Sequence, residues 1–161
     1  MIRIGIGYDI HRLEAGKTLI LGGVTIPFER GFVAHSDGDV LCHAVADALL
    51  GAAGLPNIGI LFPDTDPAFK DADSMKLLST VVERLREKHC VPLQMDANII
   101  AQRPKLQPYL EAMKHNMAQS LAIPLSAVSI KPRTNEALGA EGRGEAISAQ
   151  VVLLIEQQDP R

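Results

Sequence analysis

Cysteine is scarce in this chain. Cys42 and Cys90 are the two cysteines among 161 residues, and they do not form a CxxC pair. This number and spacing predict no disulfide framework. The first residues follow a strand-like alternation, whereas a secretion signal would place an apolar run there. We therefore expect a reducing, cytoplasmic location.

Runs of positive charge and long apolar runs are also missing. The chain has 16 Lys and Arg against 19 Asp and Glu, a net charge of -3 at pH 7. It lacks the basic clusters that nucleic-acid binders carry. No apolar stretch reaches the ~18 residues that a membrane-spanning helix needs. The sequence thus argues against nucleic-acid and membrane partners, and its length predicts one domain over residues 1–161.

The chain does contain alternating strand and helix patterns. Apolar residues recur at every second position from Ile2, which predicts a first strand. A hairpin is expected over 18–27, across a Gly-Gly pair. Three amphipathic helices are expected at 39–53, 73–88 and 106–121, and further strands at 92–101, 127–131 and 146–156. Together these elements predict an α+β fold, with a single β-sheet covered on one face by helices.

Asp9 and His11 lie two residues apart at the expected end of the first strand, so both side chains face the same side. His43, one turn into the first helix, supplies a second imidazole. Three such ligands leave the fourth position of a tetrahedral Zn²⁺ open, as in a catalytic zinc site. Asp39 and Asp47 share a helix face with His43, and we expect a carboxylate from this face to orient the imidazole. An Asp-x-His pair on its own is more often an ordinary surface feature.

Four connecting segments have residue types that suit phosphate recognition. Segment 55–73 is long for a compact domain, which favours a mobile lid. Segment 101–106 joins a strand to a helix, where backbone N–H groups and a lysine suit an anion or a base edge. Segment 131–136 combines two cations, a hydroxyl and a carboxylate, and segment 139–145 combines glycines with an arginine. Taken alone, the last three segments are better explained as a helix start, a solvated loop and a turn.

Five groups of residues occur together in a fixed order. They are GYDIH at 7–11, AHSDGD at 34–39 with His43, FPDTD at 62–66, IAQRPK at 100–105, and TNE at 134–136 with GRGE at 142–145. These groups resemble the 2-C-methyl-D-erythritol 2,4-cyclodiphosphate synthase family, the cyclising enzymes of the non-mevalonate isoprenoid pathway. The resemblance extends from Arg3 to about Leu154 and matches the stand-alone enzymes, not the fusion with a cytidylyltransferase.

This resemblance implies a phosphorus–oxygen lyase. Its substrate would be 4-diphosphocytidyl-2-C-methyl-D-erythritol 2-phosphate, and its products the 2,4-cyclodiphosphate and CMP. The substrate's 2-phosphate would attack the β-phosphorus. Such a monoester is largely dianionic at pH 7, with a second pKa of about 6, so a dedicated general base is dispensable. Zn²⁺ is expected on Asp9, His11 and His43, and a second cation, Mg²⁺ or Mn²⁺, on Glu136.

The same resemblance implies the other site residues and the assembly. His35 and Thr134 are expected to be catalytic. The sheets would pack around the axis of a homotrimer, with active sites between subunits. The expected substrate-binding residues are Ser36, Asn57, Asp64, Ala101, Lys105, Leu106, Arg133 and Arg143.

Four residues depart from the family pattern. Asn57 stands where Asp is usual, so an acceptor oxygen is kept but the charge is lost. Ala140 and Gln150 replace a common aromatic residue and a common Glu near the trimer axis. Arg133 replaces a small residue. Two other functions stay open: a zinc-dependent phosphodiesterase or hydrolase that releases a linear product, and a nucleotide-binding trimer without turnover.

Overall fold

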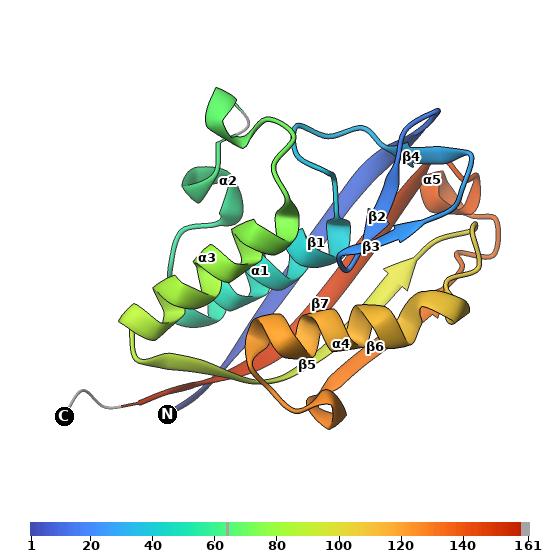
Figure 1. The fold of residues 1–161 in the computed structure, drawn as a ribbon. Coiled ribbons are helices and arrows are strands. Elements are labelled where there is room, and N and C mark those ends of the chain that lie inside the picture. Colours follow the sequence, from blue (N-terminus) through green and yellow to red (C-terminus); the bar gives the residue numbers. More distant parts are fainter. Residues whose placement is uncertain (64, 159–161) are drawn as a thin grey trace.

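The computed structural model describes residues 1–63 and 65–158, and Figure 1 shows the fold. Four strands come first, helices follow, and from Cys90 onward strands and helices alternate. The strands of the described residues are β1 (Ile2–Ala15), β2 (Leu19–Leu21), β3 (Val24–Ile26), β4 (Arg30–Phe32), β5 (Cys90–Ile100), β6 (Val128–Arg133) and β7 (Ala146–Gln157). The helices are α1 (Val40–Ala53), α2 (Ile58–Leu61), α3 (Ser74–Glu87), α4 (Leu110–Leu121) and α5 (Gly139–Gly142), with 3-10 turns η1 (Pro67–Phe69), η2 (Gln107–Tyr109) and η3 (Leu125–Ala127).

Within the described ranges, a mixed five-stranded sheet has the order β4-β1-β7-β5-β6, and β2 and β3 form a separate hairpin. β1 pairs antiparallel with β7, from Ile2 opposite Glu156 to Arg12 opposite Ala146. The first and last strands are therefore neighbours. β5 runs antiparallel to β7 but parallel to β6. As a result, the carboxyl ends of β5 and β6 lie at the same edge of the sheet.

Helices α1, α3 and α4 cover one face of the sheet (Figure 1). α1 contacts both β1 and β7, and it approaches β1 closely because glycines face it. A Cβ at Gly5 would lie 1.9 Å from the Ala48 carbonyl oxygen, and one at Gly7 1.8 Å from that of Ala44. Only residues without a side chain fit at these two positions. The close approach brings the first turns of α1 over the middle of β1.

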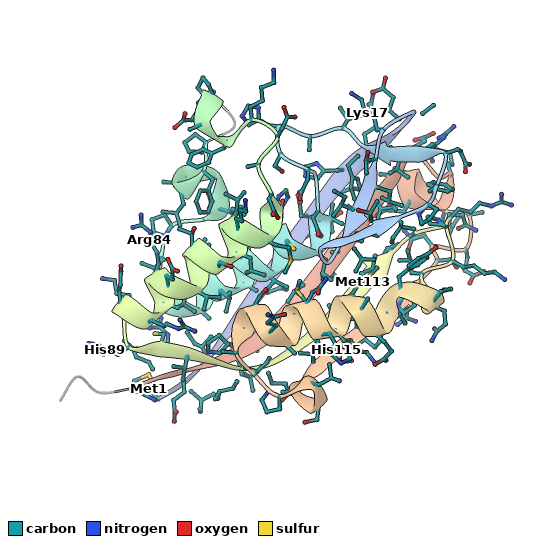
Figure 2. The ribbon with its side chains drawn as sticks, viewed as in Figure 1. Met1, Lys17, Arg84, His89, Met113 and His115 are labelled. Carbon is teal, nitrogen blue, oxygen red and sulfur yellow. The ribbon has the colours of Figure 1, made fainter. Side chains whose placement is uncertain are left out.

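The outer helix α4 has the two faces expected of a surface helix. Met113 is fully buried in the core, whereas His115 lies on the exposed side (Figure 2). α1 is different, because both of its flanks are packed and most of its residues are buried. It begins at the N-cap Asp39 and ends at Gly54, whose left-handed φ of 69° suits glycine.

The opposite face of β1 is apolar and exposed. Ile2, Ile4, Ile6 and Tyr8 are 56%, 68%, 71% and 52% exposed. Val152 of the neighbouring strand β7 adds to this surface, with 43% of its area exposed. A contiguous apolar face of this kind is typical of a surface that contacts another protein chain.

The predicted α+β class is confirmed, as are the hairpin and the three long helices. The prediction of a single sheet was incomplete, because β2 and β3 form a small sheet of their own. β1 continues to Ala15, so Asp9 and His11 lie within the strand and not at its carboxyl end. The short elements β4, α2 and α5 were not predicted. No helix in the described part of the chain is long and apolar enough to cross a membrane.

Candidate metal centre and active site

Asp9, His11 and His43 come together on the helix-facing side of β1. Asp9 Oδ2 lies 3.1 Å from His11 Nε2 and 2.8 Å from His43 Nδ1. The two imidazole nitrogens are 3.3 Å apart. All the donor atoms lie within 4.8 Å of one another, and among the described residues this is the one such group of His, Cys, Asp or Glu side chains. The three predicted ligands are thus assembled by β1 and α1.

The donors suit a divalent transition metal. Around tetrahedral zinc, bonds of about 2.0–2.1 Å place neighbouring donors roughly 3.3 Å apart. The donor–donor distances of 2.8, 3.1 and 3.3 Å need to widen only slightly to reach that value. One carboxylate oxygen with two imidazole nitrogens is also a donor set that zinc accepts. These three side chains leave the fourth tetrahedral position for a further ligand.

Asp9 and His43 shift each other's pKa. Burial alone would raise the pKa of Asp9, but the hydrogen bonds with His11 and His43 outweigh it and hold that pKa well below its usual range. Burial alone would lower the pKa of His43. The hydrogen bond and charge of Asp9, helped by the charges of Asp39 and Asp37, nevertheless raise it. A cation that binds here must therefore displace a firmly held proton.

The other nitrogen of His43 lies between two hydroxyl groups. His43 Nε2 is 2.8 Å from Ser74 Oγ and 3.2 Å from Ser36 Oγ. Ser74 also binds Asp37 twice: its hydroxyl donates to Oδ1, and its backbone N–H donates to Oδ2 at 3.0 Å. Ser74, the first residue of α3, therefore joins the metal ligand His43 to a carboxylate.

The prediction that Asp39 or Asp47 orients His43 was wrong, because backbone N–H groups occupy both carboxylates. Asp39 is fully buried and accepts from the N–H groups of Gly22 and Gly23 at 2.9 and 2.8 Å, and from the first turn of α1. Asp47 accepts from Ile58 N at 2.8 Å. Asp39 thus fixes the start of α1 against the β2–β3 turn. It positions His43 through the backbone.

A cavity of about 480 Å³ opens over the metal ligands. His35 and Ser36 line it together with Asp9, His11 and His43, so these predicted residues are gathered at one place. His35 Nε2 lies 3.2 Å from the backbone oxygen of Asp66, in the long segment 55–73. The apolar part of the lining includes Tyr8, Val33, Ile58, Phe62, Phe69 and Leu77.

Two further predicted residues belong to segment 55–73. Asn57 is exposed and caps α2, since its side-chain oxygen accepts from Ile60 N at 3.1 Å. The residues directly after it, Ile58 and Gly59, line the cavity. Asp64 lies outside the described residues, and its role in a lid stays a prediction. The short elements α2 and η1 give this segment more structure than a simple loop.

A second group of predicted residues lies at the carboxyl ends of β5 and β6. Ala101, Lys105 and Leu106 follow β5, and Thr134 and Glu136 follow β6. The parallel strands bring these segments together. The two segments, 101–106 and 133–137, are called the loop pair below.

Hydrogen bonds join the two halves of the loop pair. Ala101 N donates to the Arg133 carbonyl at 2.9 Å, and Ala137 N donates to Gln102 Oε1 at 3.4 Å. Glu136 and Ala137 have φ values of 49° and 64°, in the left-handed region that non-glycine residues seldom adopt. Backbone strain of this kind is characteristic of functional sites. Of the described residues, none in the loop pair lines the cavity over the metal ligands.

Most of the polar and charged side chains of the loop pair are exposed to solvent, so a ligand could reach them. Lys105, Arg133, Thr134 and Glu136 are exposed, whereas the apolar Leu106 is buried beneath them. The Thr134 hydroxyl lies 3.3 Å from Glu136 Oε1. A hydroxyl, a carboxylate and two cations are therefore presented together at this edge.

Arg143 forms side-chain hydrogen bonds with Glu145, and not with the metal ligands or the loop pair, among the described residues. Its guanidinium donates twice to Glu145, at 2.9 and 3.0 Å, and both side chains are exposed. To bind a phosphate, Arg143 would have to leave this partner. Ala140 lies in α5, and Gln150 lies on β7 opposite Tyr8, on the exposed side of the sheet.

Sequence reasoning missed Ser74 and the role of Asp37. Ser74 follows the N-cap Asp73 and reads as an ordinary helix start, and Asp37 reads as part of a turn. Their contact with His43 depends on how the starts of α1 and α3 pack together. No periodicity in one segment carries that information.

Comparisons with known proteins place this geometry in a family. Residues 2–156 match the model of the YgbB family. A curated relative from Salinibacter ruber, a 2-C-methyl-D-erythritol 2,4-cyclodiphosphate synthase, is 52% identical over 155 residues, covering 96% of this chain and 99% of the relative.

Solved structures give the same result. The bifunctional IspDF from Campylobacter jejuni superposes with a TM-score of 0.94 and is 40% identical over 99% of this chain, which spans 43% of that longer protein. A CDP-bound 2C-methyl-D-erythritol-2,4-cyclodiphosphate synthase superposes with a TM-score of 0.89. It is 38% identical, over 96% of this chain and 100% of that one.

Proposed function

The chain belongs to the YgbB family, and we propose that its three metal ligands and its loop pair together form the active site for the family's reaction. That reaction converts 4-diphosphocytidyl-2-C-methyl-D-erythritol 2-phosphate into 2-C-methyl-D-erythritol 2,4-cyclodiphosphate and CMP, a lyase step in isoprenoid biosynthesis. The observation that carries the assignment is the convergence of Asp9, His11 and His43 under a cavity of about 480 Å³.

We propose Zn²⁺ as the ion held by Asp9, His11 and His43, and Mg²⁺ or Mn²⁺ as the ion held by Glu136. When bound, these cations would polarise the diphosphate and neutralise the charge that develops on the departing CMP. The donor set and spacing described above support zinc. The exposed carboxylate of Glu136, beside the Thr134 hydroxyl, supports a hard cation with oxygen ligands.

Cyclisation forms a bond between an oxygen of the 2-phosphate and the β-phosphorus. The bond from that phosphorus to the bridging oxygen breaks, and CMP leaves with this oxygen. Because the attacking phosphate is already largely dianionic at pH 7, the protein's task is to position it. His35 and Ser36 in the cavity wall would hold the attacking phosphate, and Thr134 would contact the leaving α-phosphate.

The remaining residues would bind the two ends of the substrate. Lys105 and Arg133 would offer cations to the α-phosphate, and Ala101 and Leu106 would back the cytosine base. This assignment is supported by the burial of the two apolar residues and the exposure of the two cations.

Three residues would act outside the loop pair. Asn57 would accept hydrogen bonds from the sugar-alcohol hydroxyls next to the cavity wall. Arg143 would offer a further cation after release from Glu145. The expected contact of Asp64 stays a prediction that rests on the family pattern alone.

We propose that the active protein is a homotrimer with sites shared between subunits. The exposed apolar face of β1 supports a contact with another copy. The lack of common lining between the cavity and the loop pair in one chain supports sharing. In this arrangement, the loop pair of one subunit completes the cavity of its neighbour.

The function is tested by incubating the purified protein with the cytidylyl substrate, Zn²⁺ and Mn²⁺. We expect metal-dependent release of CMP together with a cyclic diphosphate that ³¹P NMR identifies. A linear diphosphate product would instead identify a hydrolase. Binding of CDP without CMP release would identify a nucleotide-binding protein that lacks turnover.

The metal ligands are tested by His43→Ala. We expect this variant to lose zinc affinity by more than ~100-fold, because even the outer partners of metal ligands contribute about 10- to 100-fold. His115→Ala is the matched control, since His115 is exposed on α4 and bonds only the Glu111 carbonyl of its own helix. Undiminished zinc content in the folded His43→Ala protein would overturn the ligand assignment.

A further inference from the structure

Ser74 is a buried hydroxyl between a metal ligand and a carboxylate. It is 1% exposed, and its oxygen lies 2.8 Å from His43 Nε2. The same oxygen donates a hydrogen bond to Asp37 Oδ1. Asp37 is itself held in place, because its backbone N–H donates to the Ala72 carbonyl at 3.1 Å. The three side chains therefore form one fixed chain of hydrogen bonds.

Which atom donates in each of these hydrogen bonds follows from the number of protons available. An ionised carboxylate only accepts hydrogen bonds, and a serine hydroxyl has one proton to give. Asp37 receives that proton, and its two oxygens also accept from the N–H groups of Ser74 and Asp39. Ser74 Oγ can then only accept from His43, so His43 must carry a proton on Nε2.

We propose that Ser74 and Asp37 are positioning residues that hold His43 as the Nε2–H tautomer, with the lone pair of Nδ1 directed at the metal. The inference rests on the metal site of the proposed function. Neutral histidine has two tautomers. Only the tautomer with an unprotonated Nδ1 can bind a metal ion that Asp9 and His11 also hold. Outer hydrogen bonds of this kind also fix the ring's orientation.

Ser36 is the alternative partner, and its contacts fit this role less well. Its oxygen is farther from His43 Nε2, at 3.2 Å. It already accepts from Gly38 N, and no described carboxylate receives its proton. Ser36 also lines the cavity, which leaves its hydroxyl available to a ligand. Ser74 is the hydroxyl committed to His43.

The main test is the zinc dissociation constant of Ser74→Ala, measured by competition with a chromophoric chelator. We expect affinity to fall by about 10- to 100-fold. Ser74→Thr keeps the hydroxyl and should restore most of the loss. Asp73→Ala is the matched control: it removes the N-cap of α3, one residue away, but no contact to His43. It should lower stability and leave zinc affinity unchanged.

A double-variant cycle separates this role from a general loss of structure. Because Asp37 acts on His43 through Ser74, Asp37→Asn should weaken zinc binding in the parent protein. It should have little further effect in Ser74→Ala. Additive losses in the double variant would show that the two residues do not act in series.

The tautomer is read directly in the metal-free protein from the imidazole ¹⁵N chemical shifts at alkaline pH. We expect Nε2 of His43 to carry the proton in the parent protein, and the preference to weaken in Ser74→Ala. A protonated Nδ1 in the parent, or parental zinc affinity in folded Ser74→Ala, would overturn the proposal. If the parent binds no zinc at all, the proposed function fails separately, while the ¹⁵N measurement still decides the tautomer.

Discussion

At the scale of single residues, a proton and a metal compete for His43. The carboxylate of Asp9 that helps to bind a cation also stabilises the protonated imidazole when no cation is present. The affinity of the proposed zinc should therefore depend on pH in part through this pair. The direction can be stated, because the pKa of Asp9 is lowered and that of His43 is raised.

We expect zinc affinity to rise with pH up to the raised pKa of His43, and to level off above it. Below that pKa, zinc must displace at least the proton on His43, so the dissociation constant should increase by about tenfold or more per pH unit. Asp9 stays ionised throughout and adds no pH dependence. Calorimetric titration of the metal-free protein with zinc at several pH values measures this.

Asp9→Asn provides the comparison for this titration. It removes the charge that holds the proton on His43. The zinc affinity of this variant should therefore level off at a lower pH than that of the parent, and should be weaker overall. Zinc affinity that does not change around the ordinary histidine pKa of 6.5 would contradict the expectation.

The sequence was informative about the metal ligands and less so about their surroundings. Asp9 and His11 are found from the period of a strand, and His43 from a helix pattern that follows. The partner of His43 is not found this way. Asp39 and Asp47 have the right helical spacing but are used by backbone N–H groups, whereas Ser74 is distant in sequence. Local periodicity predicts which residues share a face, and packing between elements decides which residues touch.

At the scale of elements, the distance between β1 and α1 sets the geometry of the metal centre. Gly5 and Gly7 allow the two elements to lie close together, and Asp39 fixes where α1 begins. His43 can reach Asp9 only in this arrangement. The two glycines therefore help to shape the metal centre through the spacing of β1 and α1, and not as metal ligands.

Gly7→Ala should push α1 away from β1 and weaken both folding and zinc binding. The new Cβ would meet the Ala44 carbonyl oxygen at 1.8 Å, and backbone atoms cannot move aside cheaply. We expect destabilisation of about 1–3 kcal/mol or more and a zinc affinity lowered by roughly tenfold or more. Urea unfolding and chelator competition measure the two effects.

Gly51→Ala is the matched control within α1. Apart from its chain neighbours and the backbone of α1 itself, no described heavy atom lies within 4 Å of the Cβ that it would gain. Alanine there should stabilise the helix by about 0.5–1 kcal/mol and leave zinc affinity unchanged. Parental stability of Gly7→Ala would show that α1 tolerates a larger separation from β1.

Long elements and the hairpin of β2 and β3, which a Gly-Gly pair marks, were predictable from the sequence, whereas other short elements were not. α1, α3 and α4 have several turns of periodic apolar residues, and β5, β6 and β7 are runs of 11, 6 and 12 residues. β4, α2 and α5 have three or four residues each, too few to show a period. The α2 helix depends on contacts such as the one between Asp47 and Ile58 N, which only the tertiary structure provides.

At the scale of the whole molecule, α1, α3 and α4 cover one face of the sheet. Among the described residues the other face is largely open, with a contact from α5 to the buried Ser148. The uncovered face is apolar along β1, and it lies behind the strand that carries Asp9 and His11. The proposed assembly and the proposed metal centre would thus use opposite sides of the same strand.

Ile6→Glu should separate the subunits of the proposed trimer. Ile6 is 71% exposed on the apolar face, so the charge costs little in a single chain but would be buried in an assembly. Analytical ultracentrifugation should show a monomer, with cyclase activity lost and zinc affinity retained. Leu125→Glu, on η3 and 38% exposed, is the control that should leave the assembly intact. A trimeric Ile6→Glu protein would exclude this face as the interface.

The pairing of β1 with β7 imposes an order on biosynthesis. At about 5–20 residues per second, the ribosome releases β1 on the order of ten seconds before β7. Until then β1 lacks the neighbour that it pairs with from Ile2 to Arg12. The nascent chain thus carries all three predicted metal ligands early, but the proposed metal centre would form only when its last strand docks. Deleting β7 would abolish zinc binding without removing a single ligand.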